Sequence, residues 1–193
     1  MENNTISNRN GIKVFVATTV YGVQNDLDRI YSMLDGFGYD VMMSHKGTFL
    51  VDSNLSNQDN CVNAVKQCDV FVGFVRPEYG SGVVGEESEK SITHLEFEAA
   101  YARGIPHFVL ADYRVTFARQ FINKNNFDIV TINSTKPVDR RSVELYNMAI
   151  LNDTQVERRK GNWVQEFKSF DDQRLFLEAQ FKDVEQIKRL IEK

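Results

Sequence analysis

Three segments of the chain carry polar residues where a nucleotide-sized ligand could be held. In the first, Thr18, Thr19 and Tyr21 follow an apolar run and supply hydroxyl groups and backbone amides that suit a ribose or a phosphate. This turn is not a dinucleotide fingerprint, because both G-x-G-x-x-G and the Walker sequence are absent. The alternative is an ordinary polar turn with local Ser/Thr hydrogen bonds.

The second segment begins with a charge beside an aromatic ring. Arg76, Tyr79 and Gly80 follow a buried apolar run, and such a pair can hold a base or a phosphate. Further glycines in this loop would allow it to move as a lid does. The alternative is a solvated surface loop, because the residues that follow are rich in glutamate.

The third segment, residues 91–100, places two carboxylates near the start of a predicted helix. Glu96 and Glu98 are the carboxylates, and Ser91 and Thr93 stand at the helix start, which faces the same side as the other two segments. The spacing Thr93-x-x-Glu96 also fits a capping box, in which Glu96 folds back onto the Thr93 amide. Spacing alone favours capping over catalysis, although an anion tied to a helix start would stay ionised and could serve both.

The small numbers of cysteine and histidine argue against several other chemistries. Two Cys and three His without metal-ligand spacing give no basis for a zinc or His-rich centre, so no metal and no cofactor are expected. Cys61 and Cys68 lie seven residues apart in a predicted helix and are interpreted as small buried hydrophobes away from the ligand. No Ser-His-Asp or Cys-His arrangement is apparent.

Composition restricts the partners and the location. The chain has 193 residues and a net charge of −4, which argues against a general nucleic-acid binder, because phosphate contacts need an excess of Lys and Arg. No run of about 18 apolar residues occurs, so no membrane partner is expected. Residues 1–11 are polar and are predicted to be a disordered leader rather than a signal peptide, which makes the cytoplasm the expected location.

The elements that must position these segments follow from the hydrophobic pattern. Apolar, β-branched runs alternate with amphipathic stretches in the first part of the chain. Because the runs are apolar nearly throughout, both sheet faces must be covered, which is typical of a doubly wound parallel sheet. We predict strands over 12–19, 39–44, 69–75 and 106–111, and helices over 25–37, 56–68 and 91–103.

After Asp112 the alternation is less regular. In the last predicted strand, Trp163, Gln165 and Phe167 share one face. The predicted elements are helices over 113–123, the first half of 137–159 and 171–193, and strands over 128–133 and 163–167.

One domain accounts for the whole pattern. We expect an α/β domain over 12–193 with a mainly parallel five-stranded sheet, made of a core (12–111), an insertion (112–162), and a last strand with a C-terminal helical elaboration (163–193). Loops that leave the carboxyl ends of parallel strands share one edge, and ligands of open α/β sheets bind there, where the strand order reverses. The three polar segments are therefore expected to meet at that edge.

Several stretches together resemble a known family. They are VFVATTVY (14–21), DLDR (26–29), CDVFVGFVRPEYG (68–80) and SITHLEFEAA (91–100), with a looser likeness over 163–170. They resemble a bacterial domain-of-unknown-function family grouped with TIR-like and nucleoside deoxyribosyltransferase-like domains. Two positions depart from its pattern: Glu78 stands where the family has the arginine of R-Y-G, and Ala17-Thr18-Thr19 replaces I-S-S-T.

The resemblance implies a TIR/flavodoxin-like fold and places a catalytic glutamate at Glu96, with Ala100 four residues later. In enzymatic TIR domains this glutamate cleaves the nicotinamide–ribose bond of NAD. The resemblance thus implies an N-ribosyl hydrolase or transferase in bacterial stress or phage-defence signalling, with NAD as substrate and self-association or a signalling partner. Two alternatives stay open: a non-catalytic TIR-like interaction module, and a nucleoside deoxyribosyltransferase-like enzyme.

Overall fold

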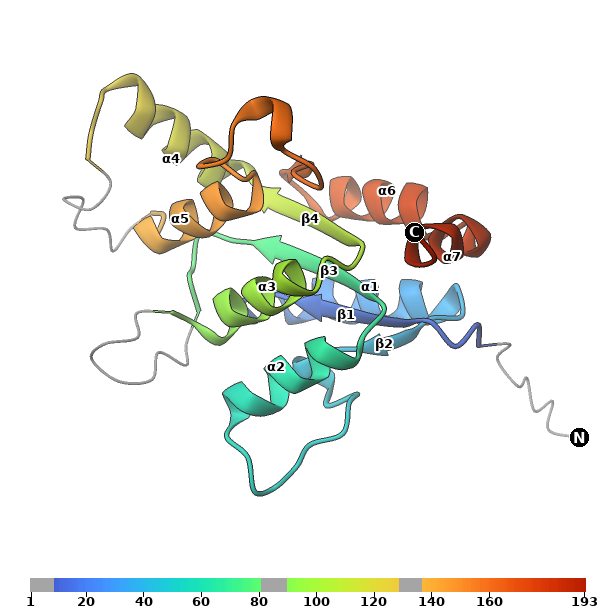
Figure 1. The fold of residues 1–193 in the computed structure, drawn as a ribbon. Helices are drawn as coiled ribbons and strands as arrows, with labels where there is room; N and C mark the ends of the chain where they lie inside the picture. Colours follow the sequence, from blue (N-terminus) through green and yellow to red (C-terminus); the bar gives the residue numbers. More distant parts are fainter. Residues whose placement is uncertain (1–8, 81–89, 129–136) are drawn as a thin grey trace, which may run out of the picture.

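A parallel sheet with helices on both faces forms the protein. Its structure is a computed structural model, which describes residues 9–80, 90–128 and 137–193. The strands pair in the order β2-β1-β3-β4-β5, and every pair is parallel (Figure 1). The predicted doubly wound α/β fold is therefore confirmed. The strands are β1 (Lys13–Ala17), β2 (Asp40–Met42), β3 (Val70–Val75), β4 (His107–Asp112) and β5 (Val164–Phe167).

Helices connect the strands and continue to the C-terminal end of the chain. The predicted final helix over 171–193 was wrong as one element, because the side chain of Asp183, in extended backbone, accepts the amide of Gln186 and starts a new helix. The predicted strand over 128–133 falls almost wholly outside the described residues, as do residues 1–8 of the predicted leader. The helices are α1 (Gln24–Gly36), α2 (Asn57–Gln67), α3 (Ile92–Arg103), α4 (Tyr113–Lys124), α5 (Arg140–Ala149), α6 (Phe170–Phe181) and α7 (Val184–Ile191), with short 3-10 turns at Ser44–Lys46 and Val156–Arg158.

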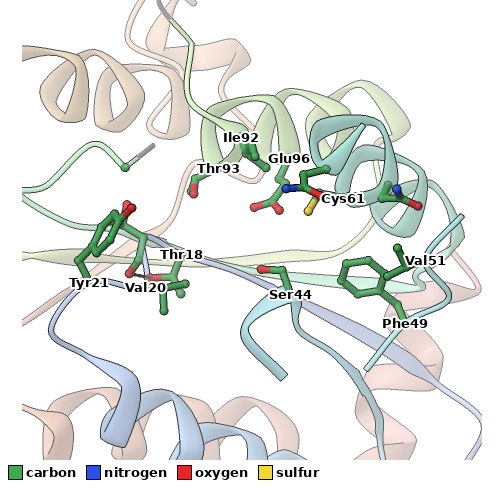
Figure 2. Close-up of a pocket in the computed structure, with 14 residues that line it drawn as sticks. Thr18, Val20, Tyr21, Ser44, Phe49, Val51, Cys61, Ile92, Thr93 and Glu96 are labelled. Atoms are coloured by element: carbon green, nitrogen blue, oxygen red, sulfur yellow. Dashed lines mark hydrogen bonds between the residues drawn. The ribbon is translucent and has the colours of Figure 1, made fainter. Parts of the chain in front are cut away.

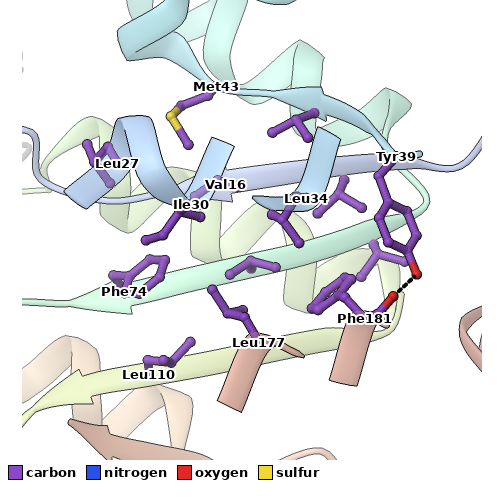
Figure 3. Packing of buried hydrophobic residues seen from close by; sticks show 14 of the residues in the cluster. Val16, Leu27, Ile30, Leu34, Tyr39, Met43, Phe74, Leu110, Leu177 and Phe181 are labelled. Carbon is purple, nitrogen blue, oxygen red and sulfur yellow. Dashed lines mark hydrogen bonds between the residues drawn. The ribbon is translucent and has the colours of Figure 1, made fainter. Parts of the chain in front are cut away.

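Each face of the sheet has its own apolar layer. On one face α1, α6 and α7 cover the sheet, and Leu27, Leu110 and Leu177 are fully buried there (Figure 3). The Tyr39 hydroxyl donates a hydrogen bond to the carbonyl of Phe181 at 2.8 Å and ties the two ends of this layer together. On the other face α2, α3, α4 and α5 cover the sheet. Burial on both faces explains why the strands are apolar throughout.

The helix α3 lies very close to the middle of β3. Gly73 in β3 has no side chain, and a Cβ atom there would overlap the ring of Phe97 from α3. The Phe97 ring instead packs edge-on against Phe71, with ring centroids 5.0 Å apart. This contact fixes the position of α3, and therefore of the neighbouring Glu96, relative to the sheet.

The strand order reverses beside β1. The chain passes from β1 outward to β2 and then returns to β3 on the other side of β1. The two connections diverge at that point, and open α/β sheets bind ligands in the resulting crevice. Within the described residues, no helix has the length and apolar character needed to span a membrane.

Candidate functional site

A cavity of about 460 Å³ opens at the carboxyl edge of the sheet, where the strand order reverses (Figure 2). Its walls come from the turn after β1, the segment after β2, Gly80 after β3, and the facing sides of α2 and α3. Its size is that of pockets for small molecules and nucleotides. The described lining residues are Thr18, Thr19, Val20, Tyr21, Ser44, Phe49, Val51, Asn57, Asn60, Cys61, Gly80, Ile92, Thr93 and Glu96.

Glu96 brings a carboxyl group to this wall, and its side chain is almost fully buried, with 3% of the residue exposed. The predicted capping box was wrong. The helix α3 begins at Ser91, whose hydroxyl accepts the backbone N–H of His94 at 3.2 Å. Glu96 lies one turn further along α3 and faces the cavity, so it takes no part in the cap.

The protonation of Glu96 is set by burial. Loss of solvation raises the pKa of Glu96 to about 8, because the ionised form is disfavoured in an apolar setting. The Cys61 thiol hydrogen-bonds to the carboxyl group and offsets part of this rise. Among the described lining residues there is no Lys, Arg or His to compensate the charge. At neutral pH the carboxyl group is thus mostly protonated, contrary to the expectation of an ionised anion at a helix start.

Cys61 belongs to the cavity wall, and the prediction that both cysteines lie away from the ligand was wrong for this one. It sits in the first half of α2, whose beginning is at the same edge as the start of α3. Burial, with the adjacent carboxyl group, raises the pKa of Cys61 to about 12, so the thiol stays protonated. Cys68 is fully buried elsewhere and donates to the Val65 carbonyl.

The threonines after β1 link this wall to the loop after β3. The Thr19 hydroxyl donates to the carbonyl of Glu78 at 2.9 Å, and the Thr18 hydroxyl donates to the carbonyl of Thr19 at 3.1 Å. Gly80 passes close by with a φ of +95°, and a Cβ atom there would stand 3.1 Å from the Thr19 hydroxyl oxygen. The left-handed backbone at Gly80 would strain any residue with a side chain, so this position favours glycine.

Five of the predicted ligand-binding residues lie on the cavity wall, namely Thr18, Thr19, Tyr21, Gly80 and Thr93. Their role in binding stays a prediction.

The other three, Arg76, Tyr79 and Ser91, are not among the residues that line the cavity. Arg76 is buried, and its Nε donates to the Thr18 hydroxyl at 3.1 Å, so it acts on the wall through Thr18. The Tyr79 hydroxyl lies 2.6 Å from Nδ1 of His94, and Ser91 caps the same helix. These three side chains therefore support residues of the cavity wall and do not line the cavity themselves.

Sequence reasoning missed two segments of the cavity wall, namely the segment that follows β2 and the first half of α2. Ser44, Phe49 and Val51 line the cavity from the first of these segments, and Asn57 and Cys61 from the second. The available signal was the stretch between the predicted strand over 39–44 and the predicted helix over 56–68, because it leaves the carboxyl end of a strand.

Asn60 also lies on this wall, and its side-chain polar groups bond to the backbone of the protein. Its side-chain carbonyl accepts the Asp52 amide at 2.7 Å, and its NH₂ donates to the Asp52 carbonyl at 3.0 Å. It therefore fixes the loop before α2 in place.

The carboxyl chemistry of the described wall rests on Glu96. A two-carboxylate glycosidase needs an acid and a second carboxylate, whereas Glu96 is the one Asp or Glu among the described lining residues. In the described parts of the chain, no group of three His, Cys, Asp or Glu side chains is arranged to hold a metal ion. In its ionised form Glu96 would stabilise a positive charge that develops on a bound sugar, and such a charge would in turn favour that ionised form against burial.

Comparison with known proteins gives a family and a distant structural likeness. A family model described as Domain of unknown function (DUF4062) matches residues 13–192. No curated protein gives a significant match. Among solved structures, the chain is similar to a 2-desoxiribosyltransferase from Leishmania mexicana, with a TM-score of 0.37 and 12% identity over 52% of this chain and 64% of that chain. The chain thus spans less than two thirds of that protein. The resemblance to TIR domains is not tested by these matches and stays a prediction.

Proposed function

The chain belongs to the DUF4062 family of domains of unknown function, and we propose that it cleaves the N-glycosidic bond of a nucleoside or nucleotide, with Glu96 as the reacting carboxyl group. The observation that carries the proposal is the position of Glu96, buried on the wall of a cavity of about 460 Å³ at the switch in strand order. The resemblance to enzymatic TIR domains points to the same residue and supports the proposal.

The proposed reaction needs few protein groups. As the bond between C1′ and the base nitrogen breaks, its electron pair leaves with the base and an oxocarbenium-like sugar remains. The Glu96 carboxylate stabilises this cation. A water oxygen then bonds to C1′, and the water proton passes to the carboxylate and from there to solvent. In a transferase, a second base or a hydroxyl group takes the place of the water.

Glu96 is the single carboxyl group among the described lining residues, and a site with one such group favours a base that leaves without gaining a proton. Nicotinamide in NAD is cationic and leaves as a neutral molecule. Its positive charge beside Glu96 would also favour the ionised carboxylate, which burial disfavours. A neutral base requires a proton donor, and Glu96 would first have to act as that acid. We therefore rank NAD first among the substrates to test and 2′-deoxynucleosides second.

The test is an assay of released base. We expect the concentrated protein to release nicotinamide from NAD, or a free base from a deoxynucleoside, detected by chromatography. Glu96→Gln keeps the side-chain shape but cannot ionise, and we expect at least about a 100-fold loss of rate. Glu98→Gln is the matched control, because Glu98 lies on the same helix but pairs with Lys90 outside the cavity lining. Equal rates for the parent protein and Glu96→Gln would contradict the proposal.

A non-catalytic interaction module remains the second candidate, and a row of exposed rings favours it. Phe117, Phe121 and Phe127 are each at least half exposed, and neighbouring rings lie 6.5 and 5.8 Å apart. Exposed apolar patches often mark interaction surfaces. Sedimentation of the parent protein and of Phe121→Ser over a range of concentrations tests this candidate. Loss of assembly in the variant alone would support it.

A further inference from the structure

A second hollow, of about 410 Å³, lies at the opposite edge of the sheet from Glu96. His107 is the first residue of β4, and Trp163 immediately precedes β5, so both mark the amino ends of parallel strands. The helix α6 forms the other side of this hollow. Its described lining residues are His107, Phe108, Trp163, Gln165, Phe176 and Gln180.

The aromatic part of the wall is backed by the core. The Phe108 ring packs against Phe181, with centroids 5.0 Å apart, and Phe181 is fully buried. Trp163, in contrast, is 73% exposed, which is a large area of indole to leave in contact with water. A flat ring that stacked on Trp163 would remove that surface from water and gain stacking energy.

The turn that precedes Trp163 is held in place by His107. Its Nδ1 lies 2.9 Å from the carbonyl of Ile105, and its Nε2 lies 2.7 Å from the carbonyl of Gly161. The Tyr101 ring covers the imidazole, with centroids 4.3 Å apart. Both ring nitrogens face backbone carbonyls of the protein, and a neutral imidazole donates to one of them at a time. His107 thus supports the turn instead of bonding a ligand.

Two amide side chains supply the polar part of the hollow. The Gln180 side chain makes no hydrogen bond within the described residues, and the Gln165 amide nitrogen donates to the Glu166 carbonyl at 3.1 Å, leaving its oxygen available. Each amide group offers a donor and an acceptor of the kind that pairs with the edge of a base. The described wall has no Lys, Arg, Asp or Glu, and both nitrogens of its one histidine, His107, face backbone carbonyls, so the wall favours a neutral ligand.

We propose that this hollow is a second ligand site, which binds a neutral planar heteroaromatic ring with amide-like edges, such as a nucleobase or nicotinamide. The ring stacks on Trp163 and Phe176 while Gln165 and Gln180 bond its edge. This proposal stands apart from catalysis at Glu96, because the two sites lie at opposite edges of the sheet and share no lining residue.

The test uses Trp163 as its own reporter, because it is the only tryptophan of the chain. Adenosine and nicotinamide are titrated into the full-length protein, with ribose 5-phosphate as the ligand that lacks a ring base. We expect saturable quenching of tryptophan emission by at least one ring compound and none by ribose 5-phosphate. Gln180→Ala should weaken that binding roughly 2- to 10-fold, the effect of one lost hydrogen bond.

Two further variants keep the test specific. Gln186→Ala removes an exposed glutamine from the next helix, and Glu96→Gln alters the other cavity; both should bind as the parent protein does. Absence of saturable quenching, or equal affinity for the parent and Gln180→Ala, would overturn the proposal. A tryptophan emission that changes with protein concentration and not with ligand concentration would also overturn the proposal. It would mean that a second copy of the protein covers Trp163.

Discussion

Glu96 and Cys61 together decide whether the candidate site holds a proton. The thiol hydrogen-bonds to the carboxyl group and favours its ionised form, while burial opposes ionisation. We therefore expect Cys61→Ala to raise the pKa of Glu96 further above its value of about 8, and Cys61→Ser, which keeps a donor, to leave it unchanged or lower. Carboxyl-carbon NMR over a pH series measures this directly.

Cys68→Ala is the matched control for that measurement. Cys68 lies on the same segment but hydrogen-bonds to the Val65 carbonyl, away from the cavity. Its replacement should leave the titration of Glu96 as it is in the parent protein. If Cys61→Ala also titrated at the parent midpoint, the thiol would have no influence on the carboxyl group.

At the scale of residues, the sequence predicted the helix that carries the candidate carboxyl group. It wrongly predicted Glu96 as a capping residue and Cys61 as a residue away from the ligand edge. Thr93-x-x-Glu96 has the spacing of a capping box, yet Ser91 starts the helix two residues earlier. Spacing shows which side chains can cap, whereas the packing of α3 on β3 decides where the helix begins. For Cys61, periodicity indicated the inner face of a helix but not which end of that face meets the ligand edge.

At the scale of elements, the contact between β3 and α3 is the tightest at any described glycine. A Cβ atom on Gly73 would overlap the Phe97 ring, so Gly73→Ala must displace either the ring or the whole helix. Overpacking of this kind costs about 1–3 kcal/mol. We expect urea unfolding to show that loss, and the displaced helix to lower the affinity of any ligand of the Glu96 cavity.

A second glycine provides the comparison. Gly36 ends α1 with nothing within 4 Å of an added Cβ atom, so Gly36→Ala should be neutral or slightly stabilising. Equal stability of the two variants would show that the close approach at Gly73 is not needed.

The order of the elements was predictable from the sequence. Strands that are buried on both faces of a sheet are apolar at nearly every position, and such runs can be recognised directly in the sequence. The break between α6 and α7 was not, because the apolar stripe of Phe181, Val184 and Ile187 continues across it. The side chain of Asp183 starts the second helix there, and a single capping residue is a weaker signal than the stripe.

At the scale of the whole molecule, the parallel sheet separates two kinds of surface. The carboxyl edge carries the buried carboxyl group of Glu96, and the amino edge carries an uncharged, ring-lined hollow around Trp163. Of the two described walls, the one at the carboxyl edge carries the acidic side chain. The other end is suited to recognition without reaction.

Burial of Glu96 also makes the stability of the whole molecule depend on pH. The carboxyl group keeps its proton up to a pKa of about 8 in the folded protein, against an ordinary value of 4.5 in the unfolded chain. Between these values the folded state binds more protons than the unfolded state. The stability that protonated Glu96 contributes is therefore fully present below pH 4.5 and is lost as the pH rises to about 8.

The variant Glu96→Gln removes this pH dependence, because its side chain cannot titrate. Relative to the parent protein it should gain on the order of a few kcal/mol between pH 5 and pH 9. Thermal unfolding of both proteins at pH 5, 7 and 9 measures the difference, and Glu98→Gln should follow the parent throughout. Parallel behaviour of Glu96→Gln and the parent would mean that Glu96 is already ionised in the folded protein.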